Sequence, residues 1–549
     1  MKTWNQTILF LGLYTLCNLS ASAEDITIKL SKKYLNFPIS HQTDRKQMTF
    51  SVDGHPDLTV NIRLAPGKAD YWVFKDVSNL KGETLTITYN GDAAGLKQIY
   101  QSDKFAGQDS LYHEKNRPQF HFTTQRGWIN DPNGLIYYNG EYHLFYQHNP
   151  YEREWENMHW GHAVSKDLIH WEELNDVLCP DKLGTIFSGS AIIDYENTSG
   201  FGSKKNPPMV AAFTYARADG QTQGIAYSLD NGRTFTKYAL NPVINSTKKW
   251  KTNDTRDPKV FWYKPNGEWV MVLNERDGHS IYTSTNLKEW TYRSHVTGFW
   301  ECPELFELPV DDDPNHTKWV MYGASGTYML GAFDGHTFTP EAGKYYYTTG
   351  SIYAAQTYNN IPASDGRRIQ IGWGRIAHPG MPFNGMYLLP TELKLKTTKD
   401  GIRLTSQPIK ETEQLFHLAK RWNNLTSDEA NQKMKEFYDA DCLRIKTTIK
   451  LSHATDAGFN LFGQRMIGYD MNGNTINGVF YSPQDPTSME ISADIYIDRT
   501  SIEVFIDGGL YSYSMERRPD PNNQEGFWFW GNRIEIKNIE VYTVDSIWK

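Results

Sequence analysis

A pattern of strand, polar turn and aromatic residue recurs four times between residues 118 and 404 of this 549-residue chain. In each copy a strand-like run ends in small residues, and an aromatic side chain opens the next run after the turn. The four aromatics are Trp171, Phe235, Trp290 and Phe338. They are 64, 55 and 48 residues apart, and an all-β repeat of this order is typical of propeller blades. Strand-like runs at 352–355 and 369–373 predict a fifth blade.

The residues before the repeat alternate apolar and polar side chains in short runs. Leu58–Leu64 and Thr84–Tyr89 are two such runs, and the turn signals Pro66-Gly67 and Asn90-Gly91 follow them. Apolar and polar side chains that alternate at every second residue, followed by turn-forming residues, indicate half-buried strands. We therefore predict a small β-sandwich over residues 24–113, with a supporting rather than a ligand-binding role.

The chain after the repeat returns to strand patterns beyond a mixed segment. Residues 406–425 predict a linker with a helical turn, and Ile495–Arg499 and Ile502–Ile506 predict successive strands. A C-terminal β-sandwich is expected over 426–549, which leaves 114–405 for the propeller. The predicted fold class is all-β, namely a five-bladed β-propeller with a C-terminal β-sandwich and a small N-terminal β-sandwich domain.

The first 23 residues have the features of an export signal. A short apolar core, Ile8–Leu16, precedes Ala21-Ser22-Ala23, the small-x-small pattern after which a signal peptidase cleaves. The core is too short to span a bilayer. Cys17 offers a lipid anchor as the alternative, but the residue before it is poor for lipidation. We predict a cleaved signal peptide, a secreted or periplasmic protein and no membrane span.

The charge balance excludes some classes of partner. The chain has 56 Lys and Arg against 64 Asp and Glu, a formal net charge of −8, and the acidity is spread along its length. There is no electrostatic footprint for nucleic acid or an anionic membrane. After removal of the signal, Cys179, Cys302 and Cys442 remain, which have the spacing of neither a disulfide framework nor a zinc site.

Three short motifs place a carboxylate beside a proline. They are Asn130-Asp131-Pro132-Asn133-Gly134, Arg256-Asp257-Pro258 and Glu301-Cys302-Pro303-Glu304, with Trp128, Trp262 and Trp300 close by. Glycoside hydrolysis needs one carboxylate that attacks or stabilises the sugar cation and one acid that protonates the leaving oxygen. A single Asp-Pro also marks ordinary turns, but three such motifs in one chain favour a sugar-cleaving site.

The three acids occupy a similar early position within their repeats. Asp131, Asp257 and Glu301 precede the marker aromatic of their own repeat by 40, 33 and 37 residues. Because the first strand of a blade lines the central axis, the three carboxylates are expected to converge at one mouth of the channel.

At these motifs the chain strongly resembles glycoside hydrolase family 32, the invertases, inulinases and levanases. The resemblance covers about Phe120 to the C-terminus. It rests on Trp128-Ile129-Asn130-Asp131-Pro132-Asn133-Gly134, Phe145-Tyr146-Gln147, Trp155, Asn157-Met158-His159-Trp160-Gly161-His162, Phe187-Ser188-Gly189-Ser190, Arg256-Asp257-Pro258, Trp300-Glu301-Cys302-Pro303 and Tyr353-Ala354. It implies a five-bladed propeller followed by a β-sandwich, and a retaining enzyme for β-fructofuranosyl bonds that uses no metal or other cofactor.

The resemblance also implies roles for the acids. Asp131 would be the nucleophile, Glu301 the acid/base and Asp257 the transition-state stabiliser, with Arg256 keeping Asp257 ionised. A retaining mechanism needs the first two about 5–5.5 Å apart and a resting proton on the acid. The residues implied to bind or wall the terminal fructose are Trp128, Asn130, Gln147, Trp155, Phe187, Ser188, Arg256 and Trp373.

Several other polar residues are interpreted as structural. Glu304 competes with Glu301 for the acid role, but two residues three apart on a strand point to opposite faces, and the family pattern favours Glu301. The two histidines near residue 160 lack a third metal ligand in a plausible motif. The residues assigned structural roles are His159, His162, Asp498, Arg499 and Glu503.

The chain departs from the common family pattern in two places. Ser351 replaces an acidic residue, and the stretches 372–375 and 378–384 replace a tryptophan-rich one. Both places are expected at the rim of the funnel, where they would affect substrate length and linkage. The extra N-terminal β-domain resembles that of bacterial members that degrade polysaccharides.

The predicted function is an exo-acting fructan hydrolase that releases fructose from levan, inulin or fructo-oligosaccharides, with sucrose as a further candidate substrate. Four alternatives stay open: an endo-levanase that releases oligosaccharides, a fructosyltransferase, a catalytically dead fructan-binding protein, and an inverting arabinanase-like enzyme. Linkage preference, the role of the N-terminal domain and the oligomeric state are left open by the sequence.

Overall fold

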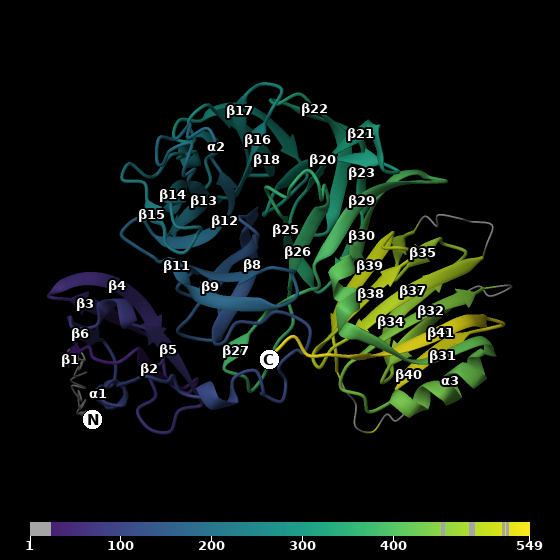
Figure 1. Cartoon of the computed structure of the whole chain (residues 1–549), viewed down its shortest axis with the longest axis horizontal. Helices are drawn as coiled ribbons and strands as arrows, with labels where there is room; N and C mark the ends of the chain where they lie inside the picture. The colour runs from purple at the N-terminus through teal and green to yellow at the C-terminus, as the bar shows by residue number, and fades with distance from the viewer. Residues whose placement is uncertain (1–22, 452–455, 482–488, 519–521, 523–525, 549) are drawn as a thin grey trace, which may run out of the picture.

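The computed structural model describes residues 23–451, 456–481, 489–518, 522 and 526–548. The described chain is almost entirely β-structure, in three regions that follow the sequence from purple through teal to yellow (Figure 1). The predicted all-β class is therefore confirmed. Residues 1–22 of the expected signal peptide, including Cys17, lie outside the described residues, so that assignment stays a prediction. No helix in the described part is long and apolar enough to cross a membrane.

The N-terminal region contains two antiparallel sheets that enclose a core with Phe37, Ile62 and Ile87. The strands expected near residues 58–64 and 84–89 are confirmed as β4 and β6. The first sheet has the order β1 (Glu24–Lys29), β6 (Thr84–Tyr89), β3 (Lys46–Val52) and β4 (His55–Ile62), and the second has β5 (Tyr71–Asp76), β2 (Tyr34–Ile39) and β7 (Tyr100–Ser102). A short helix, α1 (Ala93–Leu96), connects the last two strands in sequence.

The middle region repeats a four-stranded antiparallel sheet. The first sheet contains β8 (Gly127–Tyr138), β9 (Glu141–Asn149), β10 (His159–Ser165) and β11 (Trp171–Leu178), and the second contains β12 (Thr185–Ile193), β13 (Met209–Arg217), β14 (Gly220–Ser228) and β15 (Thr236–Lys237). The third contains β16 (Thr255–Tyr263), β17 (Glu268–Glu275), β18 (Gly278–Ser284) and β19 (Thr291–Thr297). The fourth contains β20 (Glu304–Val310), β21 (Asp313–Tyr322), β22 (Thr327–Phe333) and β23 (Phe338–Tyr346). Each marker aromatic begins the fourth strand of its sheet or directly precedes it. The repeat therefore corresponds to one sheet. The short helix α2 (Thr247–Trp250) lies between the second and third sheets.

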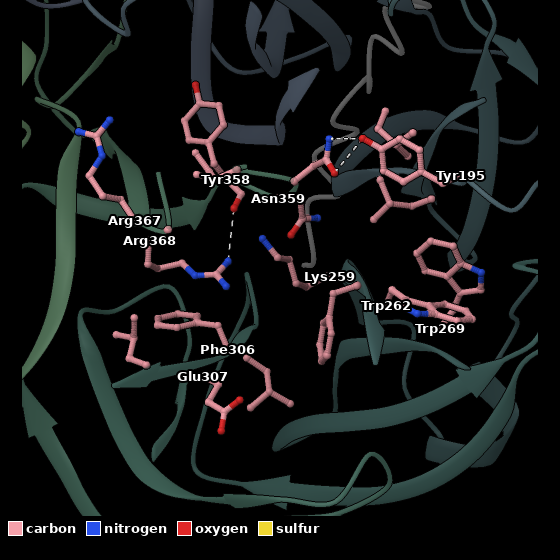
Figure 2. A pocket seen from close by; sticks show the side chains of 18 of the residues that line it. Tyr195, Lys259, Trp262, Trp269, Phe306, Glu307, Tyr358, Asn359, Arg367 and Arg368 are labelled. Atoms are coloured by element: carbon pink, nitrogen blue, oxygen red, sulfur yellow. Dashed lines mark hydrogen bonds between the residues drawn. The ribbon is translucent and has the colours of Figure 1, made fainter. Parts of the chain in front are cut away.

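Four further strands complete the middle region. They are β25 (Ile352–Thr357), β26 (Arg368–Gly374), β29 (Thr391–Thr398) and β30 (Gly401–Pro408), and a bridge between Val310 and Leu395 joins them to the sheet of β20. Two short strands also pair here, β27 (Phe383–Asn384) with β8 and β28 (Met386–Tyr387) with β26. The first strands pack side by side, β8 on β12 and β25, and β12 on β16. A cavity of about 740 Å³ opens at the far ends of these strands (Figure 2).

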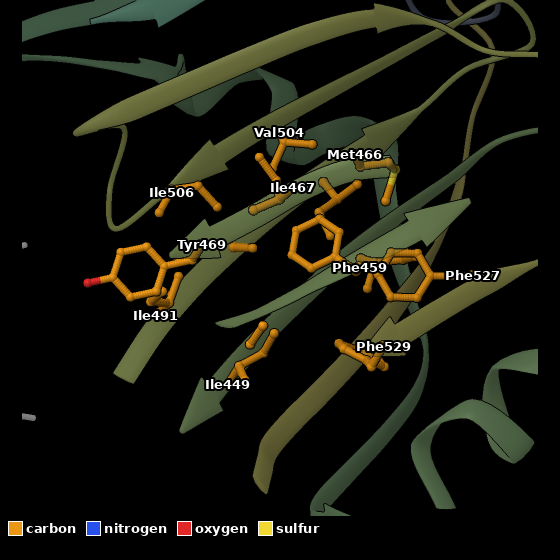
Figure 3. Packing of buried hydrophobic residues seen from close by; sticks show 14 of the residues in the cluster. Ile449, Phe459, Met466, Ile467, Tyr469, Ile491, Val504, Ile506, Phe527 and Phe529 are labelled. Carbon is orange, nitrogen blue, oxygen red and sulfur yellow. The ribbon is translucent and has the colours of Figure 1, made fainter. Parts of the chain in front are cut away.

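The C-terminal region consists of two sheets around a dense apolar core that includes Phe459, Ile467 and Val504 (Figure 3). One sheet has the order β24 (Thr348–Gly350), β39 (Tyr511–Glu516), β38 (Ser501–Ile506), β37 (Glu490–Ile497), β32 (Leu443–Lys450), β41 (Glu535–Val544) and β31 (Phe416–Thr426). The other has β36 (Val479–Phe480), β35 (Thr475–Ile476), β34 (Gln464–Asp470), β33 (Asp456–Leu461) and β40 (Phe527–Gly531). Each fully buried aliphatic or aromatic side chain contributes about 1.5–3 kcal/mol of hydrophobic free energy.

The segment expected to be a linker, 406–425, is largely structured. A 3₁₀ turn at Lys410–Leu415 agrees with the expected helical turn, but residues 416–426 form β31, which pairs with β41 along its length. Most side chains of β31 are exposed, as expected for an edge strand, so its sequence lacks the alternating apolar residues that would have predicted a strand. The helix α3 (Ser427–Met434) follows at once behind a capping box of Thr426 and Glu429.

A buried charge cluster fastens the middle region to the C-terminal sheets. His121 Nδ1 lies 2.8 Å from Asp498 Oδ2, and its Nε2 lies 2.6 Å from Glu503 Oε1. Burial lowers the pKa of His121, but the hydrogen bonds to the two carboxylates outweigh it and raise the pKa to about 9. Arg499 pairs with Asp441 at 3.2 Å. These three residues near β38 are therefore structural ion-pair residues, as predicted.

Candidate active site

The candidate site lies where the first strands of three sheets lose regular pairing. The register shifts occur in β8 at Asn130–Asp131, in β12 at Ser188 and in β16 at Asp257–Pro258. A bulge turns a side chain away from the regular face of the strand. Because β8 packs on β12 and β12 on β16, these interruptions bring their side chains together.

Asp131 is held by three donors. Its Oδ1 accepts a hydrogen bond from Asn130 Nδ2 (3.0 Å), and its Oδ2 accepts one from the Ser188 hydroxyl (2.6 Å). The Cys302 thiol approaches Oδ2 at 3.6 Å. Burial raises the pKa of Asp131, whereas the hydrogen bonds from Ser188 and Asn130 lower it. The donors therefore favour the ionised form that a nucleophile needs.

Asp257 lies on the other side of the same thiol. Its Oδ2 is 3.7 Å from Cys302 Sγ and accepts a hydrogen bond from the Cys302 backbone N–H at 3.0 Å. Burial raises the pKa of Asp257 to about 7, although the neighbouring Arg256 guanidinium lowers it. Burial also raises the pKa of the Cys302 thiol, which stays protonated and can donate to either carboxylate. Two candidate acids are thus bridged by one thiol.

Glu301 is positioned by a cation and a phenol. Its Oε1 accepts a hydrogen bond from Arg256 Nη2 at 2.5 Å, and its Oε2 accepts a very short one from the Tyr353 hydroxyl. The Glu301 backbone N–H donates to Asn274 Oδ1 (2.9 Å). Arg256 Nε is 3.7 Å from Asp257 Oδ2, so one guanidinium serves both acids. The three predicted acids are therefore brought together in one cluster.

The backbone of the cluster adopts a conformation that side chains disfavour. The φ angles are +64° at Asp257, +53° at Glu301 and +42° at Cys302. Non-glycine residues rarely occupy this left-handed region, and when they do they cluster at functional sites. The surrounding hydrogen bonds to Asp257 and Glu301 hold this geometry in place.

Unpaired donors surround the acids. Gln147 on β9 faces the interruption at 130–131, and its Nε2 is buried without a hydrogen-bond partner in the described part of the chain. The Trp373 Nε1 is in the same state, and its ring meets Trp128 edge to face at 5.8 Å. Trp128 Nε1 in turn donates to Asn130 Oδ1 (2.8 Å). Because buried donors are normally satisfied, these groups indicate a place for a polar ligand.

Exposed aromatic rings wall the mouth of the cluster. Trp155 is 50% exposed and meets the Phe187 ring edge to face at 5.8 Å. Trp300 is 45% exposed, and the Arg256 guanidinium lies 5.6 Å from its ring. Amphipathic rings of this kind provide flat surfaces on which the C–H faces of a sugar can stack.

The loop that carries Trp155 is held by the N-terminal region. Arg45 reaches Glu152 at 2.8 Å and Glu154 at 2.9 Å, and Arg63 contacts the same two carboxylates at 2.9 Å. Glu152 is fully buried, so both guanidinium groups compensate a charge that has lost its water. The N-terminal sheets therefore help to position one wall of the site, and the supporting role expected for them stays a prediction.

Glu304 does not take part in the cluster. It is buried, and it pairs with Lys259 Nζ at 2.8 Å and accepts hydrogen bonds from the backbone and hydroxyl of Thr357. The side chains of Glu304 and Glu301 do point to different places, but not because both lie on one strand with alternating faces, as was expected. Glu304 is the first residue of β20, whereas Glu301 precedes the strand in a left-handed conformation.

The two motif histidines are buried and paired within the protein. His159 Nδ1 contacts the Asn157 carbonyl, and His162 Nε2 lies 3.1 Å from His143 Nδ1. Burial lowers the pKa of each. These contacts support the structural role predicted for both, although His162 Nδ1 is buried without a hydrogen-bond partner in the described part of the chain.

The expected rim stretch 378–384 divides into two parts, of which Phe383 and Asn384 pair with Gly127 and Trp128 at the start of β8. His378 is buried, and its Nε2 hydrogen-bonds the Thr500 hydroxyl of the C-terminal region at 3.1 Å. Ser351 also donates its backbone N–H to the Ser514 carbonyl of that region at 2.8 Å. The expectation that His378 helps to shape the funnel rim was wrong, because this histidine docks the C-terminal sheets instead.

The nearest approach to a metal site in the described residues is Asp131, Asp257 and Cys302, whose ligand atoms all lie within 4.8 Å of one another. Metal binding by cysteine requires the thiolate. Burial and the two carboxylates raise the pKa of this thiol, whose Sγ lies within hydrogen-bond distance of both carboxylates. The absence of a metal stays a prediction.

Sequence reasoning missed several members of the cluster. Cys302 and Tyr353 stand in quoted motifs, so their position beside the acids was the available signal. Asn274 and Thr214, which accept the backbone N–H groups of Glu301 and Asp257, lie in ordinary strand sequence with no such signal. Only the packing of separate sheets brings these acceptors to the acids.

A buried carboxylate that accepts two hydrogen bonds, a second acid fixed by an arginine and tryptophan walls together have the chemistry of a glycosidase. Comparison with known proteins agrees. The model of the glycosyl hydrolases family 32 N-terminal domain matches residues 121–408, which include all three acids. The chain belongs to glycosyl hydrolase family 32.

Relatives in this family are similar over most of their length. A levanase of Bacillus subtilis is 40% identical over 514 residues, which cover 84% of this chain and 74% of that protein. An extracellular exo-inulinase of Aspergillus niger is 34% identical, covering 80% and 96%. The crystal structure of exo-inulinase from Aspergillus awamori is 30% identical, has a TM-score of 0.69 and covers 80% of this chain and all of that one. A fructofuranosidase of Schwanniomyces occidentalis in complex with fructosylnystose gives a TM-score of 0.66 at 26% identity, covering 80% and 98%.

Proposed function

We propose that this glycosidase hydrolyses β-fructofuranosyl bonds of fructans with retention of configuration. The observation that carries the proposal is the acid cluster, in which Asp131 and Asp257 share the Cys302 thiol and Glu301 is held by Arg256. The levanase and exo-inulinase names of the relatives support a fructan as the substrate.

In the proposed reaction Asp131 attacks the anomeric carbon while Glu301 gives its proton to the leaving oxygen. The fructosyl–enzyme ester then reacts with water, from which Glu301 takes a proton, and Asp131 is released. The hydrogen bonds from Ser188 and Asn130 favour the ionised form of the nucleophile and oppose the effect of burial on its pKa. Arg256 and Tyr353 fix the direction of the acid, which matters because misplaced groups lose rate steeply.

Asp257 is proposed to bind fructose hydroxyls and to stabilise the cationic transition state. Its charge depends on the Arg256 guanidinium, since burial alone raises its pKa. The unpaired donors of Gln147 and Trp373, together with Trp128, are proposed to hold the terminal fructose. Trp155 and Phe187 would form the wall toward the next sugar.

We further propose that the middle sheets form a five-bladed propeller over residues 114–405. The support is the packing of successive first strands and the antiparallel set β25, β26, β29 and β30, which would be the fifth blade. The remaining proposed units are a signal peptide at 1–23, an N-terminal β-domain at 24–113, and a C-terminal β-sandwich at 426–549. An exported enzyme would meet polymeric substrates outside the cell, as the extracellular name of the exo-inulinase suggests for that protein.

Exo action is the proposed mode, and release of fructose from the chain end is its signature. The test is chromatography of early products from levan, inulin and sucrose, with Asp131→Asn and Glu301→Gln as controls. Fructose alone, with loss of activity in both variants, is the expected result. A ladder of oligosaccharides from levan would replace exo with endo action.

Stereochemistry tests the mechanism separately. NMR of the first-formed sugar should show the anomeric configuration of the substrate. An inverted product would refute the retaining assignment and would favour a base that activates water directly. Full activity in Glu301→Gln would refute the acid assignment.

A further inference from the structure

A second binding feature lies at the opposite ends of the strands that carry the acids. The cavity of about 740 Å³ is lined by the last residues of β12, by Phe261 and Trp262 near the end of β16, by residues 305–309 of β20 and by the turn after β25. On β16, Trp262 lies five residues beyond Asp257, which corresponds to roughly 15 Å along a strand. A cavity of this volume falls in the range of ligand sites, about 300–1,000 Å³.

Exposed tryptophan is the feature that marks this cavity. In the described part of the chain, Trp155, Trp300 and Trp262 are the tryptophans classed as exposed, and Trp262 is 41% exposed. The first two wall the acid cluster, and the third lines this cavity. Tyr195, which is 51% exposed, lines the cavity as well. Large exposed rings gathered in a hollow usually mark a binding surface.

Both rings are fixed before any ligand arrives. Trp262 meets the ring of Trp269 edge to face at 4.9 Å, and Trp269 is anchored by its Nε1 to the Thr198 hydroxyl at 2.9 Å. The Tyr195 hydroxyl accepts a hydrogen bond from Asn360 Nδ2 at 3.0 Å. Figure 2 shows Tyr195, Trp262 and Trp269 along one side of the cavity and Arg368 across from them. Rings that are already ordered lose little entropy on binding.

The lining of the cavity offers both hydrogen-bond donors and acceptors and has little net charge. Arg367 is neutralised by Asp365 (2.7 Å) and Glu411 (2.8 Å). Lys259 is paired with Glu304 (2.8 Å) and Glu196 with Lys204 (2.5 Å). Asp194, Glu307 and Arg368 remain; the buried Asp194 carboxylate accepts hydrogen bonds from Thr198 and Ser199, and Glu307 and Arg368 have opposite charges. This balance disfavours a strongly anionic or cationic ligand. It suits a neutral one whose hydroxyls both donate and accept hydrogen bonds.

A plug of buried polar groups separates the cavity from the acids. Lys259 Nζ binds Glu304 and the Thr357 carbonyl, both at 2.8 Å. Asn359 Nδ2 donates to two backbone carbonyls of the first strands, at 2.8 and 3.0 Å. These polar groups all have their hydrogen-bond partners within the protein. A ligand in the cavity is therefore out of reach of Asp131.

We propose that this cavity is a second, non-catalytic site that binds neutral fructan chains. The inference rests on the proposed fructan hydrolase function and adds a place where a polymer is held while another segment reaches the acids. Two sites on one rigid unit raise the effective concentration of the polymer at the active site. A short substrate occupies only the acid cluster, so it gains nothing from the second site.

The test compares a polymer with a short substrate in variants of the cavity. Trp262→Ala combined with Tyr195→Ala is placed in an Asp131→Asn background, so that binding is measured without hydrolysis. Electrophoresis through gels that contain levan or inulin reports polymer affinity, and we expect it to weaken about tenfold, the range for losing two stacked rings. Tyr438→Ala, an exposed tyrosine of the C-terminal region, is the matched control and should bind like the parent.

The same cavity substitutions in the active enzyme provide the second readout. We expect unchanged kcat/KM for a fructose-terminated trisaccharide, which also shows that the fold is intact, and a raised KM for the polymer. Polymer affinity equal to that of the Tyr438→Ala control would overturn the inference and leave the proposed function standing. Failure of the unsubstituted protein to act on any fructan would overturn the proposed function and this inference with it.

Discussion

Replacement of Ser188 by alanine should shift the pH dependence of activity in a calculable way. The Ser188 hydroxyl donates the shorter of the two strong hydrogen bonds to Asp131, 2.6 Å against 3.0 Å from Asn130. A hydrogen bond to a charged group contributes about 1.5–3 kcal/mol. At about 1.4 kcal/mol per pKa unit, its loss should raise the pKa of Asp131 by about one to two units.

The direction follows from which form is active. Ser188 lowers the pKa of Asp131 by stabilising the carboxylate, so Ser188→Ala requires a higher pH before the nucleophile is ionised. The acid limb of the kcat/KM profile, which reports the free enzyme, should move up by that amount. Near the alkaline side of the profile the variant and parent should differ much less.

Ser188→Thr is the matched control because it keeps a hydroxyl on the same atom position. Its acid limb should stay within a few tenths of a unit of the parent, as expected when the hydrogen bond survives. The assay is initial rate at low concentration of a fructose-terminated trisaccharide across the pH range. An unmoved limb in Ser188→Ala, with activity lowered equally at every pH, would refute the electrostatic reasoning and assign Ser188 to substrate binding alone.

Three further predictions concern the contacts around the site. Arg45→Met should destabilise the protein by about 1–3 kcal/mol, because the fully buried Glu152 loses one of its two cations; equal thermal midpoints for variant and parent would contradict this. Stability contributed by charged His121 is present below its unfolded pKa of about 6.5 and is lost as pH rises through its folded pKa of about 9. The thermal midpoint of the parent should therefore fall across that window, and a His121→Gln variant should show a smaller fall. Glu304→Gln should cost about 3–5 kcal/mol by stranding the buried Lys259, and combination with Lys259→Met should recover much of it in a double-mutant cycle.

The local sequence predicted many of the strands and the convergence of the three acids. Alternating side chains indicated β4 and β6, and the spaced aromatics marked one sheet each. Asp131, Asp257 and Glu301 occupy similar positions within their repeats, which predicted that each lies near the beginning of a first strand. The structure brings these three residues together. Such features are readable because strand period and turn chemistry are properties of neighbouring residues.

The sequence was less informative where a residue's environment depends on distant partners. The edge strand β31 was expected to belong to a linker because its sequence is mixed, and in the folded chain its side chains are mostly exposed. His378 was expected at a rim, yet it is buried against Thr500, more than a hundred residues away. Neither the pairing of β31 nor the burial of His378 produces a repeating pattern in the local sequence, because the residues involved meet only after folding.

The sequence by itself determined that the chain is built from β-sheets, that it repeats, and which three acids have the motifs of a glycosidase. Only the tertiary structure decided how those acids are tuned. The thiol of Cys302 between Asp131 and Asp257, and the guanidinium of Arg256 on Glu301, come from different sheets. The physical reason is that burial and charge, which set the pKa of a carboxyl group, are properties of the packed molecule rather than of the strand that carries it.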